Sequence, residues 1–115
     1  MGPFNRNLQD IAKEAYHLQQ VRKADLRRGD RVIVKTHNSV YAIRVVCDGL
    51  YIVSGGWFDR KGLSPTKTTI NGCTWGGSVL KVDVVAACGL RLEFGNRLVT
   101  SVIRKIVVMP HSMEN

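Results

Sequence analysis

Hydrophobic residues near the start of the chain recur every three to four positions. Between residues 7 and 22 they form one stripe, made of Leu8, Ile11, Ala12, Ala15, Leu18 and Val21. Polar residues fill the positions between them, which is typical of an amphipathic helix with one buried face. Asn7 stands where an N-cap is expected, because Asp10 follows three residues later. The pattern therefore predicts a helix over residues 7–22.

After this segment the hydrophobic residues alternate with polar ones in short runs. The runs over residues 31–36, 40–47 and 50–53 are rich in β-branched side chains, which favours strands. Asp48-Gly49, between the second and third runs, favours a tight hairpin turn with positive φ at both residues. The three runs predict an antiparallel meander.

The last third of the chain returns to the same alternation. Gly95-Asn96 is a turn signal, and Pro110 marks the end of the ordered chain. The expected strands are residues 79–85, 90–94, 97–100 and 102–109. Because no strand alternates with a helix, a parallel βαβ arrangement is excluded.

Together these elements predict an all-β fold in a single domain over residues 1–115. Six to seven short antiparallel strands protect their edges best by curling into a small β-barrel or β-roll. The expected parts are the N-terminal α-helix over 7–22, the barrel over 26–110 and a disordered tail over 111–115.

One short motif carries a family resemblance. Leu26-x-x-Gly29-Asp30-x-Val32 resembles the start of the first strand in many SH3-like barrels. The resemblance is limited to these residues and implies a small barrel. It implies no particular function.

Residues 54–78 interrupt the alternation. Gly-Gly pairs stand near both ends, at Gly55-Gly56 and Gly76-Gly77, and Pro65 lies between them. The segment predicts a loop of roughly 20 residues, a length at which loops are often functional. Whether a short strand forms around residues 68–70 is left open.

The net charge adds a class of partner to this picture. The chain has 17 Lys and Arg against 9 Asp and Glu, which gives a formal net charge of +8. An excess of this size favours contact with polyanions. The charge is spread along the chain, but no Asp or Glu occurs between Arg60 and Val82. This acid-free stretch makes residues 54–78 the expected working surface.

Two tryptophans flank the basic residues of this stretch. In barrels that bind single strands, basic groups hold phosphates while flat rings stack on bases. The candidate nucleic-acid or polyanion contacts are Trp57 and Trp75 as stacking rings, Arg60, Lys61 and Lys67 as phosphate contacts, and Arg27 and Arg28 as an extension of the surface. The alternative is that both rings pack over glycine backbone and close one end of the barrel.

The paired glycines are candidates of their own. Consecutive glycines adopt turns whose N–H groups converge on an anion. The candidate anion-binding turns are Gly55, Gly56, Gly76 and Gly77. Neither pair lies in a nucleotide-binding fingerprint, and the alternative is a kink where strands bend.

The cysteines and histidines yield no assigned catalytic site. Cys47, Cys73 and Cys88 include no C-x-x-C pair, which argues against a zinc site and favours reduced thiols. Whether two of the three pair in space is left open. His37 with Cys47 or Cys73 is a possible nucleophile–base pair, but no hydrolase or metalloprotease motif accompanies it. No catalytic residue, metal or cofactor is therefore assigned.

The expected function is a small, basic, non-enzymatic module that binds nucleic acid or another polyanion through residues 54–78. The first alternative is a homo-oligomeric interaction module, because a spare amphipathic helix at residues 7–22 favours self-association. The second is a ligand-binding barrel or small enzyme with the long loop as a lid. Since no apolar stretch approaches about 20 residues and no signal segment is visible, we expect a cytoplasmic protein without a membrane contact.

Overall fold

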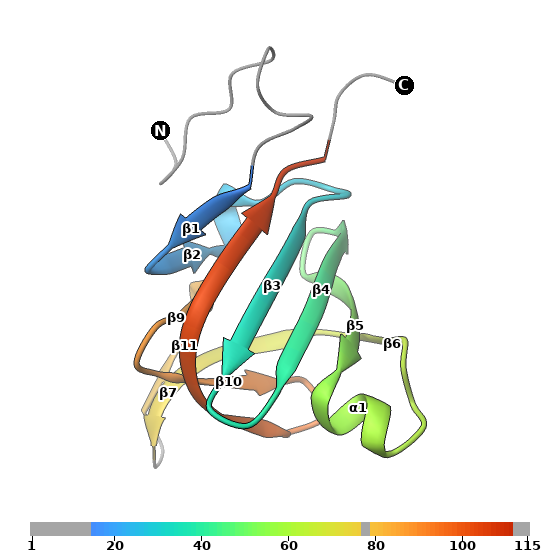
Figure 1. The fold of residues 1–115 in the computed structure, drawn as a ribbon. Helices are drawn as coiled ribbons and strands as arrows, with labels where there is room; N and C mark the ends of the chain where they lie inside the picture. Colours follow the sequence, from blue (N-terminus) through green and yellow to red (C-terminus); the bar gives the residue numbers. More distant parts are fainter. Residues whose placement is uncertain (1–14, 77–78, 112–115) are drawn as a thin grey trace.

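The computed structural model of the protein describes residues 15–76 and 79–111, which form antiparallel sheets (Figure 1). In chain order the elements are β1 (Tyr16–Leu18), β2 (Gln20–Arg22), the 3-10 helix η1 (Lys23–Asp25), β3 (Arg31–Thr36), β4 (Val40–Cys47), β5 (Leu50–Gly55), α1 (Gly56–Arg60), β6 (Thr66–Thr68), β7 (Ile70–Gly76), β8 (Val79–Lys81), β9 (Val84–Ala87), β10 (Arg91–Phe94) and β11 (Val99–Met109). The larger sheet has the order β6-β5-β4-β3-β11-β10-β7-β8, with β1 also paired to β11, and a second sheet pairs β2 with β9. The expected all-β class is confirmed.

The predicted meander is confirmed as β3, β4 and β5. The strands β3 and β4 have the predicted bounds, and β5 extends past the prediction to Gly55. Ile43 lies opposite Val32 on one side and Val53 on the other. The turn between β4 and β5 differs from the predicted type, because Asp48 lacks the positive φ that Gly49 adopts at 79°. The pairing shifts register beside this turn.

Within the described residues, the larger sheet curls but does not close into the predicted barrel. The strands β6 and β7 have only Thr69 between them, yet β6 pairs with β5 and β7 pairs with β10. The chain therefore bends at Thr69 and carries the sheet from one side of the core to the other. The terminal strands of the order, β6 and β8, are three residues long and pair with β5 and β7, not with each other.

The predicted helix over residues 7–22 is wrong where the structure describes it. Its described part forms β1 and β2, and residues 7–14 lie outside the described residues. The strand β1 pairs with β11, whereas β2 pairs with β9 in the other sheet. Because the chain changes sheet at Gln19, the alternation of inward and outward side chains in β1 does not continue into β2. The inward residues Leu18 and Val21 are therefore three positions apart, which is also the spacing of a helix face. Both side chains pack on this chain's own core, and Val21 is fully buried.

The predicted loop over residues 54–78 is also wrong, because most of it is regular structure. It contains α1, β6 and β7. Gly55, with a φ of 96°, ends β5 and precedes the helix. A Cβ at this position would lie 2.2 Å from the backbone oxygen of Val40. The glycine therefore serves a tight turn and a close backbone approach.

Strand boundaries in the last third differ from the prediction in two places. The predicted strand over 79–85 is two strands, β8 and β9, separated by a turn at Val82-Asp83. The predicted strands over 97–100 and 102–109 are one strand, β11, whose pairing with β3 shifts register near Arg104. The first half of β11 pairs with β10 and the second half with β3, so its length joins the two sides of the curled sheet.

His111 belongs to the folded chain and not to a disordered tail. Its backbone N–H donates to Oδ1 of Asp30 at 2.8 Å. Asp30 is fully buried and its Oδ2 also accepts from the N–H of Arg27 at 2.8 Å. Gly29 has a φ of 89°, and a Cβ there would lie 2.7 Å from Cγ of His111. Gly29 and Asp30 of the short motif thus join the turn before β3 to the chain that follows β11, and we call this contact the junction. Residues 112–115 lie outside the described residues.

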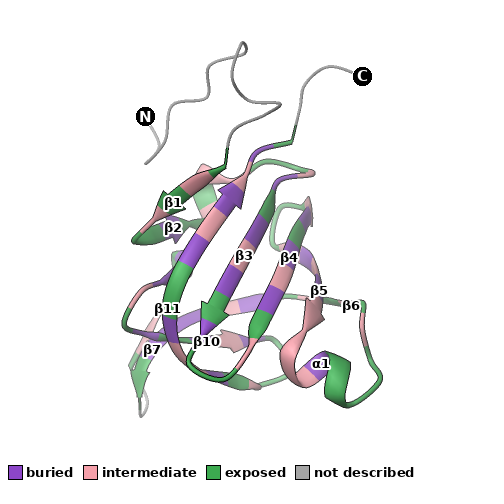
Figure 2. Ribbon diagram, in the orientation of Figure 1, coloured by how far each residue is buried: buried purple, intermediate pink, exposed green. Residues whose placement is uncertain are grey.

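The core lies between the two sides of the curled sheet and against α1 (Figure 2). Phe58, the buried residue of α1, meets Phe94 of β10 at 5.1 Å and Tyr41 of β4 at 6.2 Å between ring centroids. Both contacts are edge to face, the geometry that aromatic pairs prefer. The helix α1 therefore closes one end of the curled sheet with a single large ring.

Candidate functional site

The outer surface of β11, β3, β4, β5 and β6 carries a regular set of basic side chains, and we call it the basic face. Alternation along β3 turns Val32 and Val34 to the core and leaves the intervening residues outside. Register across the strands arranges the outward residues in three rows. In the orientation of Figure 1 the upper row is Met109, Arg31, Arg44, Ile52 and Lys67, and the lower row is Lys105, Lys35 and Val40. The middle row is Val107, Ile33, Ala42 and Ser54, and His17 of the neighbouring β1 continues it at one edge.

Like charges lie directly opposite one another in two of these rows. Arg31 of β3 pairs with Arg44 of β4, and Lys35 of β3 pairs with Lys105 of β11. Directly opposed like charges destabilise a sheet by an amount on the order of 0.2–1 kcal/mol per pair. Within residues 15–76 and 79–111, none of these four side chains has a carboxylate within 4.0 Å or donates a hydrogen bond. The arrangement is unfavourable in the free protein and favourable when an anion lies between the charges.

None of the described carboxylates lies on a strand of the basic face, and Asp30, which lies at its upper end, is fully buried. The carboxylates elsewhere are Asp25 beside Arg22, Asp30 beneath the N–H groups of Arg27 and His111, Asp59 at the N–H of Gly55, Glu93 beside Asn71, and Asp48 and Asp83 in turns. The basic face therefore concentrates positive charge without a counterion on its own strands.

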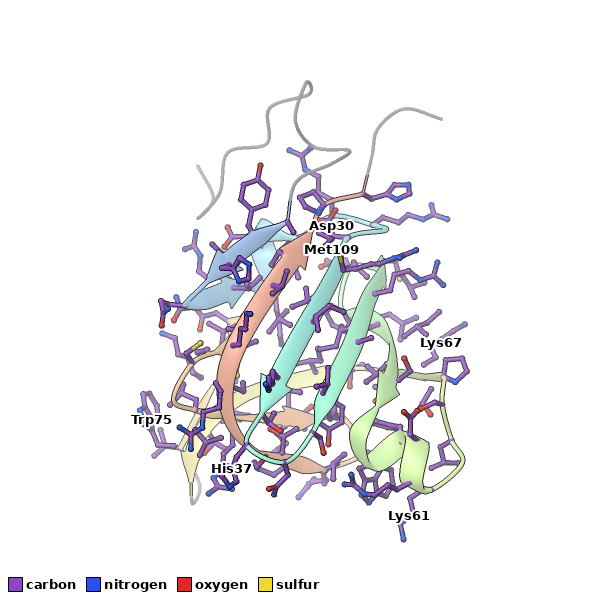
Figure 3. The ribbon with its side chains drawn as sticks, viewed as in Figure 1. Asp30, His37, Lys61, Lys67, Trp75 and Met109 are labelled. Carbon is purple, nitrogen blue, oxygen red and sulfur yellow. The ribbon has the colours of Figure 1, made fainter. Side chains whose placement is uncertain are left out.

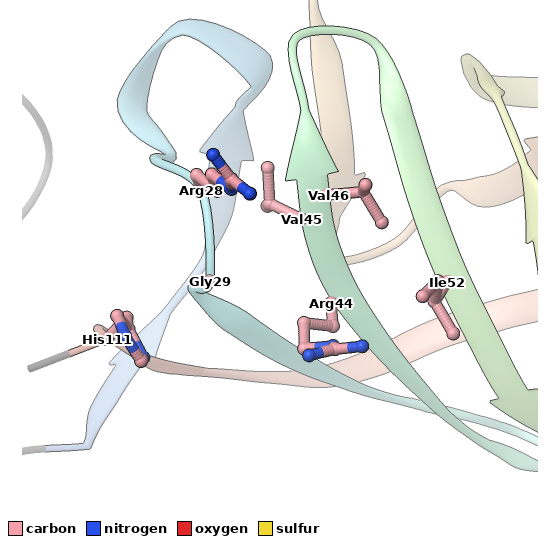
Figure 4. A pocket seen from close by; sticks show the side chains of 7 residues that line it. All are labelled: Arg28, Gly29, Arg44, Val45, Val46, Ile52 and His111. Carbon is pink, nitrogen blue, oxygen red and sulfur yellow. The ribbon is translucent and has the colours of Figure 1, made fainter.

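A groove crosses the upper part of the basic face. One depression of about 280 Å³ is lined by Arg31, Ile33, Ala42, Ile43, Arg44, Ile52, Ser54 and Met109. A second depression of about 410 Å³ shares Arg44 and Ile52 with the first, so the two lie side by side. Arg28, Arg44 and His111 reach the second depression from three separate segments (Figure 4). These nitrogen-bearing side chains suit an anion better than an apolar ligand.

Basic side chains also gather at the lower end of the basic face. Arg104 follows the register shift of β11, and its Nη2 lies 3.4 Å from Nδ1 of His37 in the β3–β4 turn. Arg60 of α1 donates from Nη1 to Oγ of Ser39 in the same turn at 3.3 Å. Figure 3 labels His37 near this end and Met109 near the other. Positive charge therefore lies at both ends of the basic face, with the uncharged middle row between them.

The three predicted phosphate contacts, Arg60, Lys61 and Lys67, and the predicted extension, Arg27 and Arg28, lie in different parts of the fold. Lys67 lies in the upper row, Arg28 lines the groove and Arg60 reaches the lower end of the basic face. Arg27 is exposed in the turn before Arg28. Lys61 is exposed at the end of α1 and lies off the strands of the basic face (Figure 3).

The two tryptophans lie apart, and neither belongs to the strands of the basic face. Trp57 is half-buried, with its ring edge to face on Phe58 at 5.3 Å. Trp75 of β7 is 64% exposed, near the exposed Val79 of β8. Figure 3 places Trp75 and Lys61 on opposite sides of the molecule. The tryptophans therefore form no joint stacking platform beside Lys61.

The N–H groups of Gly55 and Gly76 donate hydrogen bonds within the fold. The N–H of Gly55 donates to Oδ1 of Asp59 at 3.0 Å and to Oγ of Ser64 at 3.3 Å. A Cβ at Gly56 would lie 2.4 Å from Cζ of Tyr41. The N–H of Gly76 donates to Oγ1 of Thr74 at 3.0 Å, and Gly77 lies outside the described residues. This geometry favours the alternative of a kink at Gly55 and Gly56.

The residues considered for catalysis are not brought together. His37 precedes β4 and Cys47 is its last residue, so about 23 Å of extended strand separates them. Cys73 is buried in β7, and all three cysteines are free thiols. Among the described residues, no three side chains of His, Cys, Asp or Glu gather as a metal-ligand set. No helix in the described part of the chain is long and apolar enough to cross a membrane.

We expect a thiol reagent at pH 8 to modify Cys47 rapidly and Cys73 only after unfolding. Burial raises the pKa of Cys73 to about 11, and its Sγ donates to the backbone oxygen of Val85 at 3.7 Å. The thiolate that reacts is then about one thousandth of the population at pH 8. Counting reactive thiols with and without denaturant, in the protein and in Cys47→Ser, checks this. Equal rates for Cys73 and Cys47 in the folded protein would contradict the burial.

The same shift makes stability depend on pH in a defined direction. Because the pKa of Cys73 is raised from 9.0 to about 11 on folding, the folded state favours the neutral thiol. Its contribution to stability is complete below pH 9 and is lost as pH rises through 11.

Sequence reasoning missed the four residues that define the basic face, namely Arg31, Arg44, Lys35 and Lys105. A signal for the first pair was present, because the predicted meander and its turn place β3 beside β4. The second pair requires β3 to lie beside β11, which no local pattern indicates.

Comparison of the chain with protein-family models, with curated proteins and with solved structures finds no match in any of the three.

Proposed function

We propose that the protein binds nucleic acid through the basic face, with phosphate groups as the principal contacts. The observation that carries the proposal is the opposition of Arg31 to Arg44 and of Lys35 to Lys105 on strands without a carboxylate. A phosphate between two such side chains replaces repulsion with attraction. This proposal keeps the expected class of partner and moves the binding surface from residues 54–78 to the sheet.

The extent of the basic face favours a polymer over a small anion. Its five strands span about 19 Å at the usual spacing of neighbouring strands. A single small anion neutralises one pair of side chains, whereas a DNA duplex offers about one negative charge per 1.7 Å of its axis. A repeating anion therefore contacts the upper and the lower rows with one molecule, which a small anion is too short to do.

Arg44→Gln tests the proposal with two opposite effects. In the free protein the substitution removes the repulsion from Arg31, so the melting temperature is expected to rise by about 2 °C at low salt. Affinity for an oligonucleotide is expected to fall about tenfold, and the slope of log K against log salt to fall by about 1. Fluorescence anisotropy over a salt series and a thermal melt measure both.

Lys61→Gln is the matched control, because it removes one exposed charge from α1 and leaves the basic face intact. We expect its affinity to stay within twofold of the unchanged protein. If Lys61→Gln weakens binding as much as Arg44→Gln does, binding runs through α1 or through overall charge. If the unchanged protein binds no oligonucleotide at about 50 mM salt, nucleic-acid binding is wrong.

A further inference from the structure

The basic side chains of the basic face fall into two bands with a defined separation. Arg31 and Lys35 are four residues apart on β3, so the upper and lower rows lie about 13 Å apart at the usual rise of a strand. The upper band is Arg31, Arg44 and Lys67, and the lower band is Lys35 and Lys105. The middle row between them contains no Lys, Arg, Asp or Glu.

The outward residues of the basic face include no Phe, Tyr or Trp side chain. The tyrosines of its strands, Tyr41 and Tyr51, are buried on the inner side. Trp57 packs on Phe58, and Trp75 lies on β7. Proteins that hold single strands use exposed rings on which successive bases stack. The middle row has a single imidazole, His17 at the β1 edge, and otherwise aliphatic side chains and Ser54, so it offers successive unstacked bases no series of rings. The basic face is therefore better suited to a nucleic acid whose bases remain paired.

We infer that the basic face binds double-stranded DNA, with its two bands on the two phosphate backbones that border one groove. The inference rests on the proposed function and specifies its ligand. The separation of about 13 Å between the bands is close to the width of about 12 Å of the major groove in B-form DNA. The middle row then faces the major groove of the DNA. Its side chains Ile33, Ala42 and Val107 can lie there while the bases remain paired.

The same geometry indicates that binding depends weakly on base sequence. Direct readout of bases uses Arg, Lys, Asn or Gln side chains directed at base edges. The middle row offers only the hydroxyl of Ser54 and the imidazole of His17 as polar groups. Contacts to phosphate carry the interaction, and these hold for any sequence.

The test compares four ligands at about 100 mM salt, where phosphate contacts control affinity: a labelled DNA duplex of roughly 20 base pairs, each of its separated strands, and the RNA duplex of the same sequence. The unchanged full chain is expected to bind the DNA duplex at least tenfold more tightly than either strand. Two variants remove one band each, the triple variant Arg31→Gln, Arg44→Gln and Lys67→Gln and the double variant Lys35→Gln with Lys105→Gln. Either is expected to reduce the preference for the duplex below threefold, because one remaining band contacts one backbone.

The control removes two charges outside the basic face, with Lys61→Gln and Arg97→Gln together. Both residues are exposed, and the preference for the duplex is expected to remain. Thermal melts of all variants verify that each is folded.

The outcomes distinguish a failure of the inference, which is binding of double-stranded DNA, from a failure of the proposed function, which is binding of nucleic acid. Single strands that bind as tightly as the DNA duplex, or an RNA duplex that binds more tightly, would overturn the inference and leave nucleic-acid binding in place. A preference for the duplex that survives removal of either band would also overturn it. If the folded protein binds none of the four ligands even at about 50 mM salt, the inference and the proposed function both fail.

Discussion

Phe58→Ala is expected to lower the free energy of unfolding by about 3–5 kcal/mol, the range for large aromatic residues truncated in a core. Phe58 is fully buried, and its ring meets Phe94, Tyr41 and Trp57 edge to face. The cavity left by the ring lies where α1 closes the curled sheet, and strands on either side are unable to collapse into it. Chemical denaturation measures the loss, and the melting temperature is expected to fall by roughly 10–20 °C.

The control for this prediction is Leu63→Ala, in the same segment. Leu63 is 50% exposed, so its truncation is expected to cost less than about 0.5 kcal/mol. Phe58→Leu, which keeps most of the apolar volume, is expected to fall between the two. A loss below 1 kcal/mol for Phe58→Ala would contradict the role of α1 as the closure of the core.

Asp30→Ala is expected to lower the free energy of unfolding by about 3 kcal/mol, because it leaves buried hydrogen-bond donors without an acceptor. The carboxylate accepts from the N–H groups of Arg27 and His111, both at 2.8 Å, and is itself fully buried. The two bonds join the turn before β3 to the end of β11. Urea denaturation of Asp30→Ala measures the effect.

Asp59→Ala is the matched control for Asp30→Ala. Asp59 is exposed and accepts one bond, from the N–H of Gly55 at 3.0 Å, so its loss is expected to cost about 1 kcal/mol or less. Asp30→Ala is also expected to weaken DNA binding, because the junction positions Arg28 and His111 at the groove. Equal stability losses for the two variants would show that burial of Asp30 adds nothing.

Local sequence accounts for the part of the fold whose partners are close in the chain. The strands β3 and β4 have their predicted bounds, since each alternates cleanly and a short turn joins them. Neighbouring strands of a hairpin find their register through that turn, without information from the rest of the chain.

The prediction failed where the chain changes partner. Leu18 and Val21 have helical spacing because β1 and β2 join different sheets at Gln19, which breaks the alternation. The segment 54–78 was predicted as a loop because its glycines resemble turn signals. Gly55 instead allows a tight bend into α1, and Phe58 supplies the ring that closes the core.

The candidate site likewise combines contacts between strands that are near in the chain with contacts between strands that are distant in it. The sequence alone establishes an excess of positive charge, an all-β class and, through the meander, the proximity of Arg31 to Arg44. Folding adds the pairing of β3 with β11, which sets Lys35 against Lys105 and completes the second band. Strands so distant in the chain are joined by burial of their inner faces in a common core, and no pattern within either strand encodes that choice of neighbour.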